Sequence, residues 1–175
     1  TGEHVLRSLG DDIDMLLDAG STTGGLESTV LDVTATPPRL LRPGLVTRAE
    51  FEAVVGPVAL SDDDVGDGPA RSPGQMRRHY APRTPLEIHA NSAQRVMDLA
   101  PREHIGWLTH RDDGEIATVL RIVLPADPVS YSAQLYAALH RLDDAGLDRI
   151  VVERPPDEDA WLAVHDRLRR AAETD

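Results

Sequence analysis

The pattern of apolar and polar positions divides the chain into three stretches. The first ends near residue 60 and holds short apolar runs bounded by Gly, Pro or Thr. Such runs are typical of strands, and they predict strands at 13–18, 28–33 and 39–42. An apparent helix precedes them and ends at Gly10.

A second helix of this stretch begins with a capping box. Thr47 can accept a hydrogen bond from the amide three residues on, and the Glu50 side chain can reach back. Phe51, Val54 and Val55 supply the expected apolar face. Three strands and two helices within roughly 60 residues make a marginal core, so we expect this stretch to be part of a domain.

Residues 61–83 show neither a helical nor a strand period and predict a linker. Its acidic run, 62–64, is typical of a solvated loop, with a magnesium site as the alternative. The following segment, 72–82, reads SPGQMRRHYAP and places cations, an imidazole and an aromatic ring close together. That set suits adenine and phosphate groups, and it equally suits a latch between domains.

From residue 84 onward, strand and helix patterns alternate. The expected strands are 85–88, 104–108, 118–124 and 149–153. Three helices are expected, the first at 92–99. The second has Ser130 or Ser132 as its N-cap, and its apolar face consists of Leu135, Leu139 and Leu142. The apolar face of the third consists of Trp161, Val164 and Leu168. This alternation predicts an α/β fold, with a mostly parallel sheet covered on both faces in a small Rossmann-like domain. It holds no Gly-x-Gly-x-x-Gly turn and therefore no dinucleotide fingerprint.

The amino-acid composition excludes several kinds of functional site. The chain has 175 residues, a net charge of −12, no cysteine, and 18 basic residues that are all arginine. The absence of cysteine removes disulfides and cysteine-ligated zinc, and the absence of lysine removes a Walker A loop and Schiff-base chemistry. No apolar run approaches the ~20 residues of a membrane helix, which excludes a protein that spans the membrane by such a helix. We expect a cytoplasmic location. The acidic balance argues against direct binding of nucleic acid.

Two features could carry chemistry. The loop at 20–29 is rich in Gly, Ser and Thr, which suits the binding of an anion as well as an ordinary connection between strands. Arg42 ends a strand before Pro43, where its guanidinium could fork onto a carboxylate or phosphate, or simply cover the strand end. The histidines are scattered singly, and neither metal-ligand spacing nor a Ser-His-Asp arrangement is recognisable.

Three motifs occur in an order that resembles a known family. They are GLESTVLD at 25–32, LRPG at 41–44 and SPGQMRRHYAP at 72–82. The chain resembles the long, two-domain form of L-threonylcarbamoyladenylate synthase, in the YrdC-like superfamily, and its tail at 131–170 is similar to that family's C-terminal domain. The resemblance implies that residues 1–60 are the C-terminal part of a YrdC-like catalytic domain, 61–83 the linker and 84–175 the Rossmann-like domain.

The resemblance also implies an activity. The family joins L-threonine, bicarbonate and ATP into threonylcarbamoyl-AMP and releases pyrophosphate, which makes it a nucleotidyltransferase. Its product feeds the threonylcarbamoyladenosine modification of tRNA, so tRNA would be a partner only indirectly, through a downstream transferase. Mg²⁺ is expected with the ATP phosphates, but its ligands are not identifiable in this sequence, and no membrane partner is expected.

Residue roles are carried over by position. By this resemblance Ser28 holds the threonine substrate, with Thr29 beside it, and Arg42 contacts ATP. In the linker, Tyr80 contacts ATP and His79 is its neighbour. No residue is assigned as catalytic.

The resemblance places two further family motifs, a lysine-and-arginine strand and a Ser-x-Asn motif, upstream of Thr1. We therefore expect the isolated chain to be inactive. The competing hypothesis is a non-catalytic C-terminal module that binds a nucleotide or a partner protein. A direct RNA binder is a third hypothesis, which the net charge of −12 disfavours.

Overall fold

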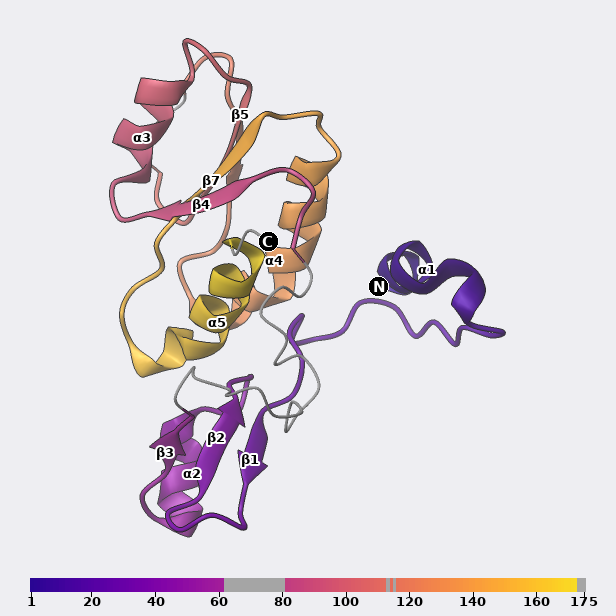
Figure 1. Ribbon diagram of the computed structural model, residues 1–175, viewed down its shortest axis with the longest axis vertical. Helices are drawn as coiled ribbons and strands as arrows, with labels where there is room; N and C mark the ends of the chain where they lie inside the picture. The colour runs from indigo at the N-terminus through magenta and orange to yellow at the C-terminus, as the bar shows by residue number, and fades with distance from the viewer. Residues whose placement is uncertain (62–80, 113, 115, 173–175) are drawn as a thin grey trace, which may run out of the picture.

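The structure is a computed structural model that describes residues 1–61, 81–112, 114 and 116–172. A three-stranded sheet of order β1-β2-β3 lies at one end of the molecule, and a four-stranded sheet of order β4-β7-β5-β6 lies at the other (Figure 1). The fold is α/β, as predicted. Of the predicted linker, residues 62–80 lie outside the described residues.

The larger sheet is parallel throughout. Its strands are β4 (Leu86–His89), β5 (Ile105–Thr109), β6 (Leu120–Val123) and β7 (Arg149–Glu153). The two central strands, β7 and β5, are buried along nearly their whole length because helices cover both faces of the sheet. This confirms the mostly parallel sheet that the alternating pattern predicts.

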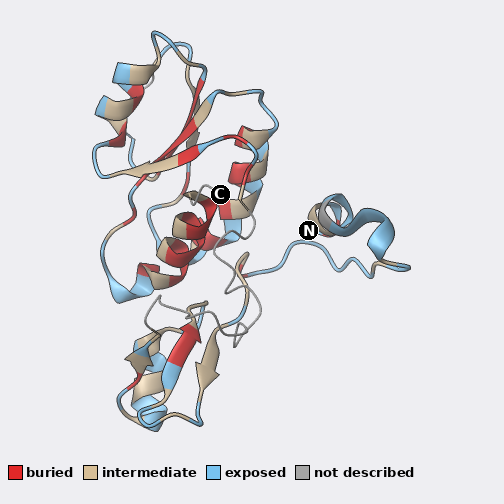
Figure 2. Ribbon diagram, viewed as in Figure 1, coloured by how far each residue is buried: buried red, intermediate tan, exposed pale blue. Residues whose placement is uncertain are grey.

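Alternate residues of β7 pack on opposite faces of the sheet. Val151 packs with Val96 of α3 and with Trp107, whereas Ile150 and Val152 belong to the cluster that α4 and α5 complete. The helices and the short 3₁₀ turn are α3 (Ser92–Leu99), α4 (Pro128–Asp143), η2 (Asp159–Trp161) and α5 (Leu162–Ala172). Figure 2 shows the buried residues concentrated in this sheet and its helices.

Helix α4 confirms its predicted stripe and corrects its predicted cap. Leu135, Leu139 and Leu142 are all buried, each contributing about 1.5–3 kcal/mol relative to an exposed side chain. The cap is Asp127, whose carboxylate accepts a hydrogen bond from the Ser130 amide at 2.8 Å. The predicted caps, Ser130 and Ser132, lie inside the helix because it begins earlier, at Pro128, and proline is favoured as the first residue of a helix.

The N-terminal part holds six short elements. They are α1 (Gly2–Leu9), η1 (Gly10–Asp12), β1 (Val30–Asp32), β2 (Arg39–Arg42), α2 (Arg48–Val55) and β3 (Ala59–Leu60). Strand β2 pairs antiparallel with β1 and parallel with β3. This small sheet carries the residues of the candidate site.

Helix α2 has the predicted start but not the predicted packing. Thr47 and Glu50 make both hydrogen bonds of the capping box. The expected apolar face is wrong, however, because Val54 is 83% exposed and Val55 44% exposed. None of the residues of α2 is buried. A period-3.6 pattern predicts which side chains share a face, but not whether another element covers that face.

The strand predicted at 13–18 is wrong. These residues have no regular structure, and Met15 and Leu17 are 78% and 88% exposed. A strand forms only where a neighbouring strand accepts its hydrogen bonds, and no pairing to this segment occurs within the described part of the chain.

A search of the described ranges finds no helix that is both long enough and apolar enough to cross a membrane.

Candidate functional site

The loop before β1 and the turn after β2 meet because these strands are antiparallel. Their register sets Val30 opposite Arg42, so the end of β2 lies beside the start of β1. Ser28 and Thr29, which precede β1, therefore lie next to the residues that end β2. The strand pairing converts a separation of 14 residues along the chain into direct contact.

Arg42 binds the Ser28 segment through its guanidinium group. Its Nε donates to the backbone oxygen of Ser28 at 3.0 Å, and its Nη2 lies 3.5 Å from the Ser28 Oγ. Ser28 is exposed and Arg42 is half-buried. A hydroxyl and a guanidinium side by side suit the binding of a carboxylate or a phosphate. The structure thus brings two of the predicted site residues together, while their individual roles stay predictions.

Gly44 lets the two segments approach each other closely. A Cβ at this position would lie 2.4 Å from the Thr29 amide nitrogen and 2.6 Å from the Glu27 carbonyl oxygen. Both neighbours are backbone atoms, so no side chain could move aside to make room. Glycine is required here by proximity, which explains its place after Arg42 in the LRPG motif.

The Thr29 hydroxyl ties the loop to the same turn. Its Oγ1 donates to the Val46 carbonyl oxygen at 2.8 Å. This contact holds the start of β1 against the chain that leads into α2. In this structure the Thr29 hydroxyl therefore has a structural partner, and its predicted place beside the substrate stays a prediction.

Glu27 connects the loop to helix α5. Its Oε2 accepts from the Arg167 Nε at 2.7 Å. Burial alone would raise the pKa of Glu27, but the charge and the hydrogen bond of Arg167, with a further contribution from Arg42, hold that pKa below its usual value. Glu27 is therefore ionised at neutral pH, next to the two cations.

The same loop is seated on helix α4. Gly25 has a φ of +68°, and a Cβ there would lie 2.4 Å from the Ser132 carbonyl oxygen. Leu26 packs against the core cluster formed by α4, α5 and the larger sheet. The loop that carries Ser28 is thus supported by the C-terminal part of the chain.

Two other predicted site residues, His79 and Tyr80, lie outside the described residues. Their predicted contact with ATP therefore stays a prediction.

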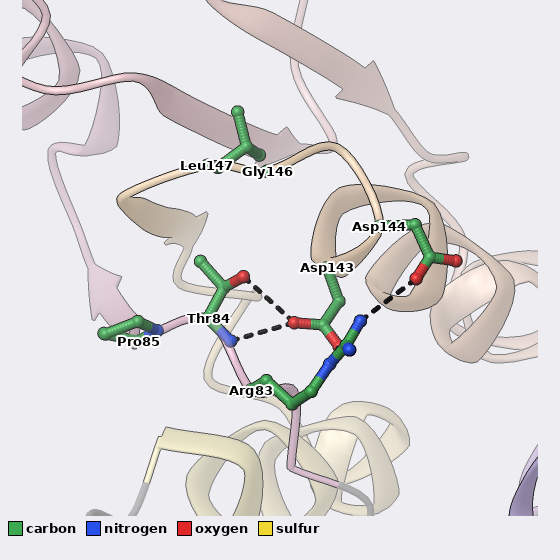
Figure 3. A pocket seen from close by; sticks show the side chains of 7 residues that line it. All are labelled: Arg83, Thr84, Pro85, Asp143, Asp144, Gly146 and Leu147. Carbon is green, nitrogen blue, oxygen red and sulfur yellow. Dashed lines mark hydrogen bonds and ion pairs between the residues drawn. The ribbon is translucent and has the colours of Figure 1, made fainter.

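A separate, open hollow of about 460 Å³ lies where the chain enters the larger sheet, just before β4 (Figure 3). At its centre Asp143 accepts from the Thr84 amide at 2.8 Å and from the Thr84 hydroxyl at 2.9 Å. Arg83 spans Asp143 and Asp144, at 3.2 and 3.3 Å. Because these polar groups already pair with one another, the hollow serves as a structural joint between α4 and β4.

Among the described residues, no cluster of three or more His, Asp or Glu side chains could hold a metal ion.

Sequence reasoning assigned no role to Arg167. Its nearest partner in the site, Glu27, is 140 residues away along the chain. Asp166 and Arg167 fall within the stretch that resembles the family's C-terminal domain, but a pair of neighbouring charges in a helix is usually solvated. The role of Arg167 in the fold is seen only from its contact with Glu27, where the loop packs on α5.

Comparison with known proteins gives two family matches along the chain. The model described as "Threonylcarbamoyl-AMP synthase, C-terminal domain" matches residues 46–173. A second model, of the Sua5/YciO/YrdC group and described as "Telomere recombination", matches residues 1–44.

Curated relatives and solved structures agree with these matches. The threonylcarbamoyl-AMP synthases of Bacillus subtilis and Pyrococcus abyssi are 35% and 31% identical, over 97% and 98% of this chain. The crystal structure of P. abyssi Sua5 complexed with L-threonine superposes with a TM-score of 0.82 at 30% identity, covering 98% of this chain and 53% of that one. The chain spans about half the length of these relatives, 52% and 53% of the two synthases.

Proposed function

Because the chain belongs to the threonylcarbamoyl-AMP synthase family, we propose that the full-length protein makes threonylcarbamoyl-AMP from L-threonine, bicarbonate and ATP. The observation that carries this proposal is the likeness, over 98% of this chain, to a protein crystallised with L-threonine. The meeting of Ser28 and Arg42 in one exposed site supports it independently.

The chemistry is an activation by adenylylation. The amine of threonine condenses with bicarbonate, losing water, and gives a carbamate. A carbamate oxygen then attacks the α-phosphorus of ATP, the bond from that phosphorus to the bridging oxygen breaks, and pyrophosphate leaves. Such transfers depend on the positioning of the reactants and on neutralisation of charge more than on covalent help from the protein.

The residues of the site suit these tasks. We assign the exposed hydroxyl of Ser28 to binding of the threonine substrate, with Thr29 beside it. Arg42 supplies a fixed positive charge for ATP, since a guanidinium can bind phosphate oxygens in a fork. Tyr80, with His79 as its neighbour, would contact ATP from the predicted linker.

The finer architecture follows from the same proposal. Residues 1–60 would be the C-terminal part of a YrdC-like catalytic domain, 61–83 a linker that closes the nucleotide pocket against water, and 84–175 a Rossmann-like domain. Mg²⁺ would accompany the ATP phosphates and neutralise their charge. The product would reach tRNA only through a downstream transferase. None of the findings favours the alternative of a non-catalytic binding module.

The test is release of pyrophosphate by the purified full-length protein. We expect release that requires ATP, L-threonine and bicarbonate together, with threonylcarbamoyl-AMP identified by mass spectrometry. Omission of threonine is the internal control. Pyrophosphate release that is indifferent to threonine, or no release with all three substrates, would contradict the proposed function.

A further inference from the structure

A buried cation of the C-terminal part reaches both segments of the candidate site. Arg167, on α5, is only 5% exposed in its side chain. Its Nε donates to Glu27 Oε2 at 2.7 Å, and its Nη2 donates to the Pro43 carbonyl oxygen at 3.2 Å. Glu27 lies in the loop before β1, whereas Pro43 lies in the turn after β2. One side chain of the C-terminal part therefore links the two segments that the pairing of β1 with β2 also brings together.

The contacts fall directly beside the predicted substrate residues. Glu27 immediately precedes Ser28, and Pro43 immediately follows Arg42. A shift of either contact would move the backbone that carries one of these two side chains. The hydrogen bonds from Arg167 to Glu27 and Pro43 therefore hold the backbone next to each of these two side chains.

Arg167 is itself held in a fixed orientation. Its Nη1 donates to Asp166 Oδ2 at 2.5 Å, and Asp166 also accepts from Arg170 Nε at 3.1 Å. The planar fork of an arginine can meet partners in several directions at once, which the single ammonium of a lysine cannot do in the same geometry. Helix α5 therefore presents a rigid donor to the site.

Charge balance makes this arrangement stable at neutral pH. A buried guanidinium is costly unless it is paired, and here the carboxylates of Glu27 and Asp166 pair with it. Burial would lower the pKa of Arg167, but the charge and hydrogen bond of Glu27 outweigh this effect and raise it.

We propose that Arg167 is a positioning residue of the threonine site, through which the C-terminal part of the chain sets the relative placement of Ser28 and Arg42. This inference rests on the proposed function. It gives the C-terminal part a task in the reaction, because the loop and the turn of the site are both hydrogen-bonded to its helix layer.

The test compares Arg167→Gln with Arg48→Gln in the full-length protein. Arg48, on α2, donates to Asp159 at 2.8 Å and so also links the N-terminal and C-terminal parts, but it lies in neither segment of the site. We expect Arg167→Gln to raise the KM for threonine about tenfold or more, with a smaller change in kcat, because a small misplacement of binding groups is costly. Arg48→Gln should stay within about twofold of the wild type if positioning, and not interdomain pairing as such, is what matters.

Two further variants separate positioning from structural support. Glu27→Gln removes the same ion pair from the other side, so it should raise the KM for threonine similarly. The double variant with Arg167→Gln should have a KM for threonine no higher than that of the more impaired single variant, because both changes remove one shared interaction. Arg167→Lys keeps the charge but loses the fork, and it should also raise the KM. If Arg167→Gln does not fold, the lysine variant takes its place. Hydrogen exchange should show faster exchange of the Ser28 and Thr29 amides in the Arg167 variants than in Arg48→Gln.

The outcomes are distinct. A KM for threonine that stays within twofold of the wild type in Arg167→Gln and Arg167→Lys overturns the inference, even if the melting temperature falls, because that result describes a structural latch. An active wild type with an insensitive Arg167 refutes this inference alone. A wild type without threonine-dependent turnover refutes the proposed function, and this inference with it.

Discussion

Individual residues of the site are constrained mostly by backbone atoms. Gly44 admits no side chain because the Thr29 amide and the Glu27 carbonyl lie within 2.4 and 2.6 Å of its Cβ position. The Arg42 Nε donates a hydrogen bond to the Ser28 carbonyl oxygen, so the guanidinium group is held in place before any ligand binds. Preorganised donors of this kind pay their ordering cost during folding instead of during binding.

Arg42 gives the first prediction. In the full-length protein, Arg42→Ala should lower kcat/KM for ATP. The expected loss of transition-state stabilisation is about 1–3 kcal/mol, the range of a charge-assisted contact. The matched control is Arg39→Ala, at the exposed start of the same strand. Steady-state kinetics with varied ATP measure both. An unchanged kcat/KM in Arg42→Ala would show that the guanidinium serves only the Ser28 loop.

The residues of the site were only partly predictable from the sequence. Ser28 and Arg42 stand in short motifs whose residue types suit anion binding. Arg167 carries no such signal, because its partner Glu27 is 140 residues away and their contact exists only after the loop docks on α5. Sequence patterns report local chemistry, whereas contacts between residues this far apart along the chain depend on tertiary structure.

At the scale of elements, the predictions succeeded where the pattern was strong and a partner was present. Strand β7 and helix α3 have the predicted bounds, 149–153 and 92–99, because β7 is buried within the larger sheet and α3 packs on that sheet through Val96. The segment at 13–18 has a comparable apolar run but no strand beside it in the described part of the chain, so it stays irregular. The apolar face of α2 is likewise not buried.

The cap of α4 gives a prediction at this scale. Asp127→Ala removes the acceptor of the Ser130 amide, and an N-cap lost in this way costs about 0.5–2 kcal/mol of stability. Urea denaturation followed by circular dichroism measures the change. Asp157→Ala, at an exposed aspartate of a loop, is the control. Equal stabilities of the two variants would contradict the role of Asp127 as the cap.

At the scale of the whole molecule, ion pairs between described residues connect the N-terminal and C-terminal parts of the chain. Arg7 on α1 pairs with Asp144 at the end of α4, Arg48 on α2 pairs with Asp159, and Arg167 pairs with Glu27. The first two involve exposed carboxylates and contribute little to stability. The third is enclosed, which is why we assign the coupling of the two parts to Arg167.

The joint of Figure 3 gives a prediction for acid stability. Burial would raise the pKa of Asp143, but hydrogen bonds from Thr84 and Arg83 hold it below the ordinary value of 3.8. The unfolded chain therefore takes up this proton first, so the contribution of Asp143 is present above about pH 3.8 and is lost as the pH falls further. Between roughly pH 5 and pH 2, the free energy of unfolding should fall less steeply in Asp143→Asn than in the wild type. Parallel slopes in urea titrations would contradict this assignment.

The most direct test of the account is binding of L-threonine to the full-length protein by isothermal titration calorimetry, with Ser28→Ala and Ser21→Ala compared. Ser21 lies in the same loop and is exposed, so its variant controls for a general change in the loop. We expect saturable binding that Ser28→Ala weakens at least several-fold and Ser21→Ala leaves unchanged, since the Ser28 hydroxyl lies beside the Arg42 guanidinium. Equal affinity of wild type and Ser28→Ala, or no binding of threonine by the wild type, would contradict it.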